Sequence, residues 1–321
     1  MTSSTRSRFQ RLALLVLGAL LVVFGLTQIS GAIARAFTGG VSGMAATTVL
    51  FDETFRVAPG EHLDLDLGSE AVTVRTVRGN RARVVVEGSG RDAAREFERR
   101  RFSAHADDGL VVRTDPPRRM FSLRRTNARF EVTVEIPRRF DVDLDVGSGA
   151  VQVETLDGDL AVDTGSGAVR LADVTGDRVT VDTGSGSVRA GRLQGEVTID
   201  TGSGSVRVER AGGPLTIDTG SGAVEVGLAE GPAHVDTGSG GVRLALASRS
   251  PVEIDTGSGG VSLTLPRAGF DVDLEGGRVE IDEALGFRGE RERDRAEGTL
   301  GRGGPLVDVN TGSGRVRLRA R

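Results

Sequence analysis

The chain has 321 residues, of which 38% are hydrophobic, 47 are glycine and none is cysteine, and its formal net charge is −4. The absence of cysteine excludes a disulfide framework, a thiolate nucleophile and a cysteine-based zinc site. The length and the hydrophobic content predict one elongated domain with a tether.

The N-terminus predicts a membrane anchor. Residues 1–11 carry three arginines, and residues 12–34 are uncharged and nearly all apolar. About 22 helical residues extend roughly 33 Å, which is enough to span a bilayer. The preceding arginines place residues 1–11 in the cytoplasm and the rest of this single-pass protein outside the cell membrane. The competing interpretation is a cleaved signal peptide, which predicts a secreted protein. Residues 35–47 predict a flexible linker.

Residues 48–140 predict an N-terminal β part with one short helix. Runs of alternating apolar and polar residues indicate strands, and residues 91–101 indicate the helix, with Asp92 placed to cap it. We expect this part to cover one end of the repeat that follows, because the end coils of a repeat array need covered edges.

Residues 81–139 form an arginine-rich region. They contain 15 arginines and 9 acidic residues, a net charge of +6 in a chain that is acidic overall. Export makes nucleic acid an unsuitable partner. The region therefore predicts contact with anionic lipid headgroups or envelope polymers, and the alternative is a set of scattered, solvated arginines.

Residues 141–321 are dominated by an internal repeat. The string Asp-Thr-Gly-Ser-Gly begins at Asp163 and recurs at intervals of 18 or 19 residues, with weaker copies that include Asp145, Asp273 and Asn310. Apolar residues stand three and one positions before each Asp and six and eight positions after it, and the sixth is always valine. This alternation predicts two short strands per unit, so the fold class is all-β, a single-stranded β-helix or β-solenoid preceded by one transmembrane helix.

The glycines of the repeat predict structural corners between the two strands. Glycine permits positive φ at a bend where a β-branched residue resists it. The predicted corner residues are Gly165, Gly167, Gly184, Gly186, Gly202, Gly204, Gly220, Gly222, Gly238, Gly240, Gly257 and Gly259.

The aspartates of the repeat are open to two interpretations. In the first, each carboxylate accepts a hydrogen bond from the corner backbone, and the arginines seven positions later offset the repulsion between stacked carboxylates. In the second, a ladder of cations binds the carboxylates, because hard ions prefer oxygen ligands. The weak metal candidates are Asp163, Asp182, Asp200, Asp218, Asp236 and Asp255. A pepsin-like dyad needs two facing copies, whereas stacked coils place the aspartates in a row.

The repeat becomes irregular after Ile281. Residues 288–297 alternate arginine with acidic residues and predict an exposed loop or a short salt-bridged helix. Asn310 lies two periods after Asp273, so we expect a degenerate coil between them, with residues 310–318 closing the stack.

The ordered motifs resemble those of the bacterial putative-adhesin family of domains of unknown function, also called the toastrack domain. They are Glu53-Thr54-Phe55 with Val57 and Pro59-Gly60, the strand ending Val134-Glu135-Ile136-Pro137, the repeated Thr-Gly-Ser-Gly, and Gly303-Gly304-Pro305. The resemblance covers about residues 50–320. It implies an extracytoplasmic β-helical domain, often membrane-tethered, with a role in surface adhesion or envelope-stress signalling, and it implies no catalytic residue.

The leading hypothesis is a non-enzymatic, membrane-tethered, adhesin-like solenoid that presents a polar repetitive surface to an envelope or surface protein or polymer. The alternative is a sensor or scaffold of an envelope-stress system, and the remote alternatives are a cation-binding solenoid and a carbohydrate-active enzyme. We expect no catalytic residue and no cofactor.

Overall fold

The computed structural model describes residues 47–107, 109–115 and 127–321. The predicted cytoplasmic tail, the predicted span 12–34 and nearly all of the linker lie outside these residues, as does the segment 116–126. The described residues lie in one compact unit. No helix within the described ranges is long and apolar enough to cross a bilayer.

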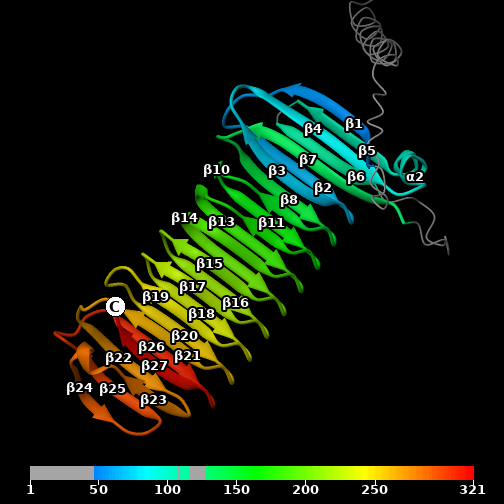
Figure 1. Ribbon diagram of the computed structural model, residues 1–321. Helices are drawn as coiled ribbons and strands as arrows, with labels where there is room; N and C mark the ends of the chain where they lie inside the picture. The colour runs from blue at the N-terminus through cyan, green and yellow to red at the C-terminus, as the bar shows by residue number, and fades with distance from the viewer. Residues whose placement is uncertain (1–46, 108, 116–126) are drawn as a thin grey trace, which may run out of the picture. The chain divides into compact units, whose positions relative to one another are not determined.

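The compact unit is a stack of β-coils (Figure 1). Each repeat supplies a strand that ends in Asp-Thr, a Gly-Ser-Gly corner, and a second strand that begins at the repeat valine. The first strands pair in parallel to form what we call the aspartate sheet, and the second strands form the opposite sheet. Apart from helix α2 (Ala93–Arg99) and the short 3₁₀ helix η1 (Glu283–Leu285), the regular structure described is all strand.

The aspartate sheet takes its strands from every coil. In spatial order they are β6 (Leu110–Asp115), β2 (His62–Leu67), β8 (Asp141–Val146), β11 (Leu160–Thr164), β13 (Val174–Thr183), β14 (Val188–Thr201), β16 (Leu215–Thr219), β18 (Ala233–Thr237), β20 (Val252–Thr256), β26 (Leu306–Thr311) and β22 (Phe270–Glu275).

The opposite sheet follows the same order. Its strands are β7 (Arg129–Pro137), β3 (Ala71–Val77), β9 (Val151–Val153), β12 (Val169–Leu171), the first part of β14, β15 (Val206–Ala211), β17 (Val224–Ala229), β19 (Val242–Leu246), β21 (Val261–Leu265), β27 (Arg315–Ala320) and β23 (Arg278–Ile281).

The nine repeat valines form one interior row, as the alternation predicts. Each pairs in register with the valine of the neighbouring coil, from Val151 to Val261 and then through Val316 to Val279, and each is at most 4% exposed. The four predicted apolar columns share one continuous hydrophobic core. Since burying one such side chain is worth roughly 1.5–3 kcal/mol, the stack is held together by these columns.

The core contains an apolar column that the sequence analysis missed. It lies ten or eleven residues after the repeat Asp, on a short third side of the coil that includes β10 (Leu156–Asp157). Its members are buried: Leu156, Val174, Leu193, Ala211, Ala229, Leu246 and Leu265. The first five members lie three residues after the preceding inward residue, so strand alternation does not mark them, whereas Leu246 and Leu265 continue the alternation of β19 and β21.

The corner glycines occupy the predicted position, but the predicted reason is wrong. None of the twelve is among the described glycines with positive φ. Instead, a Cβ built on Gly167 would overlap the carbonyl oxygen of Gly149, and one on Gly186 would overlap that of Gly167. The corners therefore need glycine because the backbone of the preceding coil approaches closely. Among the second breaks of the described coils, positive φ occurs at Gly195, with a φ of 96°, and not at Gly158, Gly176, Gly213 or Gly231.

The N-terminal end is covered by a coil that stacks out of sequence order. The coil of β6 and β7 lies outside the coil of β2 and β3, although it follows it in the chain. Three further strands pair antiparallel at this end: β1 (Thr47–Arg56), β4 (Arg81–Ser89) and β5 (Arg101–Ala106). The predicted helix is α2, and Asp92 stands at its N-cap but makes no capping hydrogen bond with its side chain.

Two predictions about the C-terminal end are wrong. The segment between Asp273 and Asn310 is not a degenerate coil, and residues 288–297 form neither a loop alone nor a helix. They belong to an antiparallel hairpin of β24 (Phe287–Arg291) and β25 (Arg295–Leu300), which pairs with β22.

The coil that contains Asn310 does not close the stack. Its strands β26 and β27 lie between the coil of β20 and β21 and the outermost coil of β22 and β23. Asp273 is also out of register as a repeat aspartate, because it lies opposite Asp308, and Glu275 lies opposite Asn310.

Candidate interaction surface

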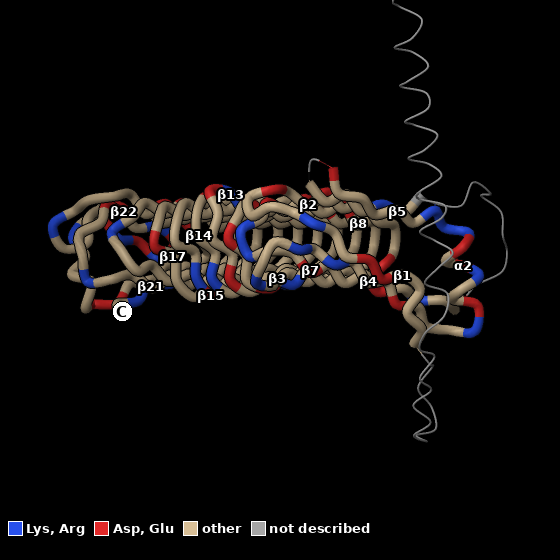
Figure 2. Tube along the Cα trace, turned by 90° about the horizontal axis from the view of Figure 1, so that it is seen from above, with Lys and Arg blue, Asp and Glu red and all other residues tan. Residues whose placement is uncertain are grey.

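The repeat aspartates form one outward row on the aspartate sheet. Cα pairing joins Asp66, Asp145, Asp163, Asp182, Asp200, Asp218, Asp236, Asp255 and Asn310 in that order. Their side chains point away from the core and are exposed, except that of Asp255, which is half-buried. Figure 2 marks the acidic residues along the stack in red.

Stacking raises the pKa of carboxyl groups in this row. Partial burial raises the pKa of Asp200, and the neighbouring carboxylates of Asp182 and Asp218 raise it further. The pKa of Asp145 is raised by the same two causes, burial first and then its acidic neighbours. The carboxylates therefore repel one another across the coils, as parallel in-register stacking dictates.

The corner hydrogen bonds come from the threonines and not from the aspartates. Gly204 donates its backbone N–H to Thr201 Oγ1 at 3.0 Å, and Thr201 Oγ1 donates to the carbonyl of Gly186 in the preceding coil at 3.3 Å. The same pair of bonds recurs at Thr219, Thr237, Thr256 and Thr311. These threonines are at most 5% exposed. The predicted aspartate turn is thus replaced by a buried threonine ladder that links the coils.

The arginines seven positions after the repeat aspartates lie on the opposite sheet. Arg170, Arg189 and Arg207 stack in register, and Arg207 pairs with Glu225 of the next coil at 2.5 Å. In the described part of the chain no ion pair joins this column to the aspartate row. The arginines therefore do not offset the repulsion within the row.

The six aspartates that were candidate metal ligands lie in a row and do not converge on one point. Asp163, Asp182, Asp200, Asp218, Asp236 and Asp255 each lie one coil from the next. Within the described ranges no group of three or more histidine, aspartate or glutamate side chains is arranged to hold a metal ion.

Several arginines of the region 81–139 pair with carboxylates. Arg83 binds both oxygens of Asp52 at 2.7 Å, and Arg113 binds Asp64 at 2.7 Å. Arg138 binds Asp157, and Arg100 binds the buried Glu70 and also lies over the ring of Phe130. These contacts reduce the positive charge that the region offers to an anionic surface.

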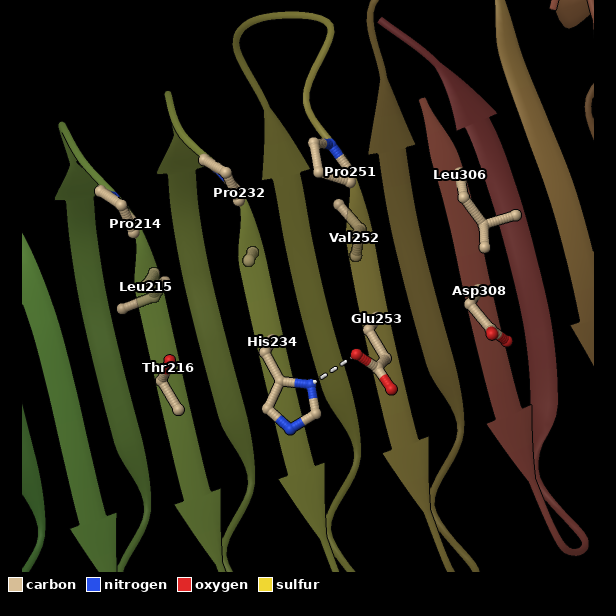
Figure 3. Close-up of a pocket in the computed structure, with 11 residues that line it drawn as sticks. Pro214, Leu215, Thr216, Pro232, His234, Pro251, Val252, Glu253, Leu306 and Asp308 are labelled. Atoms are coloured by element: carbon tan, nitrogen blue, oxygen red, sulfur yellow. Dashed lines mark ion pairs between the residues drawn. The ribbon is translucent and has the colours of Figure 1, made fainter. Parts of the chain in front are cut away.

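A groove on the aspartate sheet was not predicted from the sequence. The groove has a volume of about 410 Å³ and lies across β16, β18, β20 and β26 (Figure 3). Pro214, Pro232, Pro251 and Leu306 occupy equivalent positions at the start of these strands and are exposed. We call this set the proline groove. A signal was present in the sequence, since three consecutive repeats carry proline four residues before the repeat Asp.

The polar side of the proline groove is acidic. His234 Nδ1 lies 3.1 Å from Glu253 Oε2, and Asp308 lies on the next strand (Figure 3). Burial raises the pKa of Asp308, and the carboxylates of Asp273, Asp255 and Glu253 raise it further. The nearby Arg249 donates to the carbonyls of Gly269 and Gly303 and so is directed at the backbone.

The chain matches one protein family. The profile of Toastrack DUF4097 matches residues 61–319. The comparison with curated proteins returns no match.

Solved structures that resemble the chain include a putative adhesin from Bacteroides fragilis. That protein is 12% identical with a TM-score of 0.42, over 67% of this chain and 96% of that chain. A putative lipid binding protein from Parabacteroides distasonis is also 12% identical with a TM-score of 0.42, over 83% and 96% of the two chains. A putative adhesin from Parabacteroides merdae is 11% identical with a TM-score of 0.34, over 66% and 95%.

Proposed function

The chain belongs to the Toastrack family, and on that premise we propose that it is a non-enzymatic, adhesin-like β-solenoid that binds a partner through the aspartate sheet. The observation that carries the proposal is the combination on one face of a regular carboxylate row and the proline groove. Exposed apolar residues rimmed by polar ones are typical of protein interaction sites.

A binding role also agrees with how the polar groups are used. The threonine hydroxyls are engaged in linking coils, and the repeat aspartates stand in a row along which no two face each other across a cleft. Acid–base catalysis by paired carboxylates requires two groups that converge on one substrate position. The described residues offer a repeated surface, which suits binding to an extended protein or polymer.

We further propose that residues 12–34 tether this unit to the cell membrane, with the solenoid on the extracytoplasmic side. The support is the uncharged apolar run of the sequence and the arginines before it. The partner is then an envelope or surface protein or polymer. Anionic headgroups are a second proposed partner, bound by the arginines of residues 81–139.

Binding of cells or isolated envelopes to beads that carry the full chain tests the function. Changing Asp218, Asp236 and Asp255 together to lysine reverses the charge of the row next to the groove, and we expect at least a fivefold loss of bound material. The matched control changes Arg189, Arg207 and Arg243 to glutamate on the opposite sheet and should bind as the parent does. Equal losses in both triple variants, or a loss in neither, contradict the proposal.

Deleting residues 1–36 separates adhesion from the alternative, a sensor or scaffold of envelope stress. An adhesin deleted in this way should still bind its target when added to cells from outside. A sensor that acts through the anchor should instead lose its stress response on deletion, while the added protein binds nothing.

A further inference from the structure

The apolar strip of the proline groove has no cover among the described residues. Pro214, Pro232, Pro251 and Leu306 stand on four adjacent strands, so the strip is about 14 Å long at 4.8 Å per strand. Leu306 is 47% exposed, and among the residues that the structure describes Val49 is the other large hydrophobic residue with a similar exposure. A strip of this kind is stabilised when a partner removes it from water.

The carboxylates around the strip favour a cationic partner. Glu253 and Asp308 line the groove, and the row of Asp218, Asp236 and Asp255 runs beside it two residues further along the same strands. His234 is the basic side chain in the lining, and it is paired with Glu253. The matching partner therefore combines apolar side chains with several basic ones and carries no acidic residue at the contact.

The chain contains a segment with this composition. Residues 116–126 read Pro-Pro-Arg-Arg-Met-Phe-Ser-Leu-Arg-Arg-Thr, with four arginines, three large apolar side chains and no acidic residue. The described residues fix only its two ends, at Asp115 on β6 and at Asn127 just before β7.

The segment cannot reach the groove of its own chain. From Asp115 to Asn127 there are twelve residue steps, which extend at most about 43 Å, so a segment held at both ends reaches about 21 Å. The nearest strand of the groove, β16, lies six strand steps from β6, or roughly 29 Å. Any contact between the two must join separate molecules.

We propose that the proline groove binds residues 116–126 of a second copy of this chain. Two copies lying antiparallel satisfy both contacts at once, because the separation between segment and groove along the stack is the same in each. The result is a closed, two-fold symmetric dimer in place of an open filament. The inference rests on the proposed function: in an antiparallel pair the two β1 strands lie at opposite ends of the dimer, an arrangement that suits copies carried by two facing cell surfaces.

Cross-linking tests the proposal directly, because the chain has no native cysteine. One full-length copy carries Phe121→Cys and the other carries Leu306→Cys, and the mixture is treated with a short bismaleimide. The expected product is a cross-linked pair that forms only in the mixture. The matched control replaces Leu306→Cys with Arg243→Cys, an exposed position on β19 of the opposite sheet. Equal yields with the two partners overturn the proposal.

A second measurement covers the case in which a variant folds poorly. A fluorescent peptide of residues 114–128 is titrated with the unmodified full chain and followed by anisotropy. We expect saturable binding that weakens at least tenfold when the four arginines become glutamine, and likewise when Met120, Phe121 and Leu123 become serine. Absence of binding, or binding that survives the serine changes, overturns the proposal.

The experiments distinguish failure of the proposed adhesive function from failure of the proposed dimer. If beads carrying the full chain still bind envelopes while the peptide and the cross-linking give nothing, the aspartate sheet binds a different partner and self-association is wrong. If copies cross-link as expected but no envelope material binds, the adhesive role is wrong and the dimer stands.

Discussion

At the residue scale, the aspartate row is a source of instability at neutral pH. The pKa of Asp200 is raised by burial and by Asp182 and Asp218, so the folded state holds its proton more tightly than the unfolded state does. Its contribution to stability is therefore fully present below the unfolded pKa, near 3.9, and is lost as the pH rises through the higher folded value.

Asp200→Asn should accordingly leave the protein as stable or more stable at pH 7, by less than about 1 kcal/mol because the site is solvated. The advantage over the parent should disappear near pH 3, where both side chains are neutral. Unfolding in denaturant at the two pH values measures this. A variant that is clearly less stable at pH 7 would show that the carboxylate holds a favourable partner, such as a cation.

Substitution of a buried threonine, unlike Asp200→Asn, should destabilise the protein. In Thr219→Val the shape is kept, but the N–H of Gly222 and the carbonyl of Gly204 lose their partner inside the stack. An unpaired buried polar group costs about 1–3 kcal/mol, so we expect a loss of that order in denaturant unfolding. Thr216→Val on the same strand is the control, because Thr216 is exposed. Losses of the same size in both variants would mean that the ladder adds no stability.

At the element scale, the corner depends on close approach between coils. A Cβ on Gly222 would overlap the carbonyl oxygen of Gly204, whereas a Cβ on Gly241 would meet an oxygen of Gly260 at 3.5 Å, an ordinary contact. We expect Gly222→Ala to lower the thermal midpoint clearly, with a cost of about 1–3 kcal/mol or more, and Gly241→Ala to be nearly neutral. If the order is reversed, backbone conformation and not stacking distance selects glycine at the corner.

The strands and their inward residues could be predicted because alternation with period 2 and a fixed repeat length are both visible in one sequence. The physical role of each corner residue could not be predicted. Only apolar residues are counted as core positions in the sequence, so Thr219 and its counterparts are not predicted to be inward, although they are buried. The hydroxyl is buried because it has two backbone partners, and those partners belong to different coils that only the stacked structure brings together.

At the scale of the whole molecule, the order of coils is not the order of the sequence. Repeat spacing predicts which residues share a column but not which coil is outermost, because either order satisfies the same columns. Both ends depart from sequence order, since β2 and β3 lie inside the coil of β6 and β7, and β26 and β27 lie inside the coil of β22 and β23. The proline groove depends on the second departure, because it places Leu306 beside Pro251.

This interleaving makes the last strands essential for a segment that precedes them. Deleting residues 305–321 removes β26 and β27, the only strands that join β22 and β23 to the rest of the two parallel ladders described. We expect the deleted protein to be cut by trypsin within residues 288–295, which contain four arginines. The coils up to β21 should stay resistant, since each is held by its own neighbours. The matched control, Arg319→Gln, alters an exposed side chain of β27 and should leave the hairpin protected. Equal protection in the deleted protein would mean that the outermost coil can dock on β20 and β21 directly, so that the inserted position of the chain end is not required by the fold.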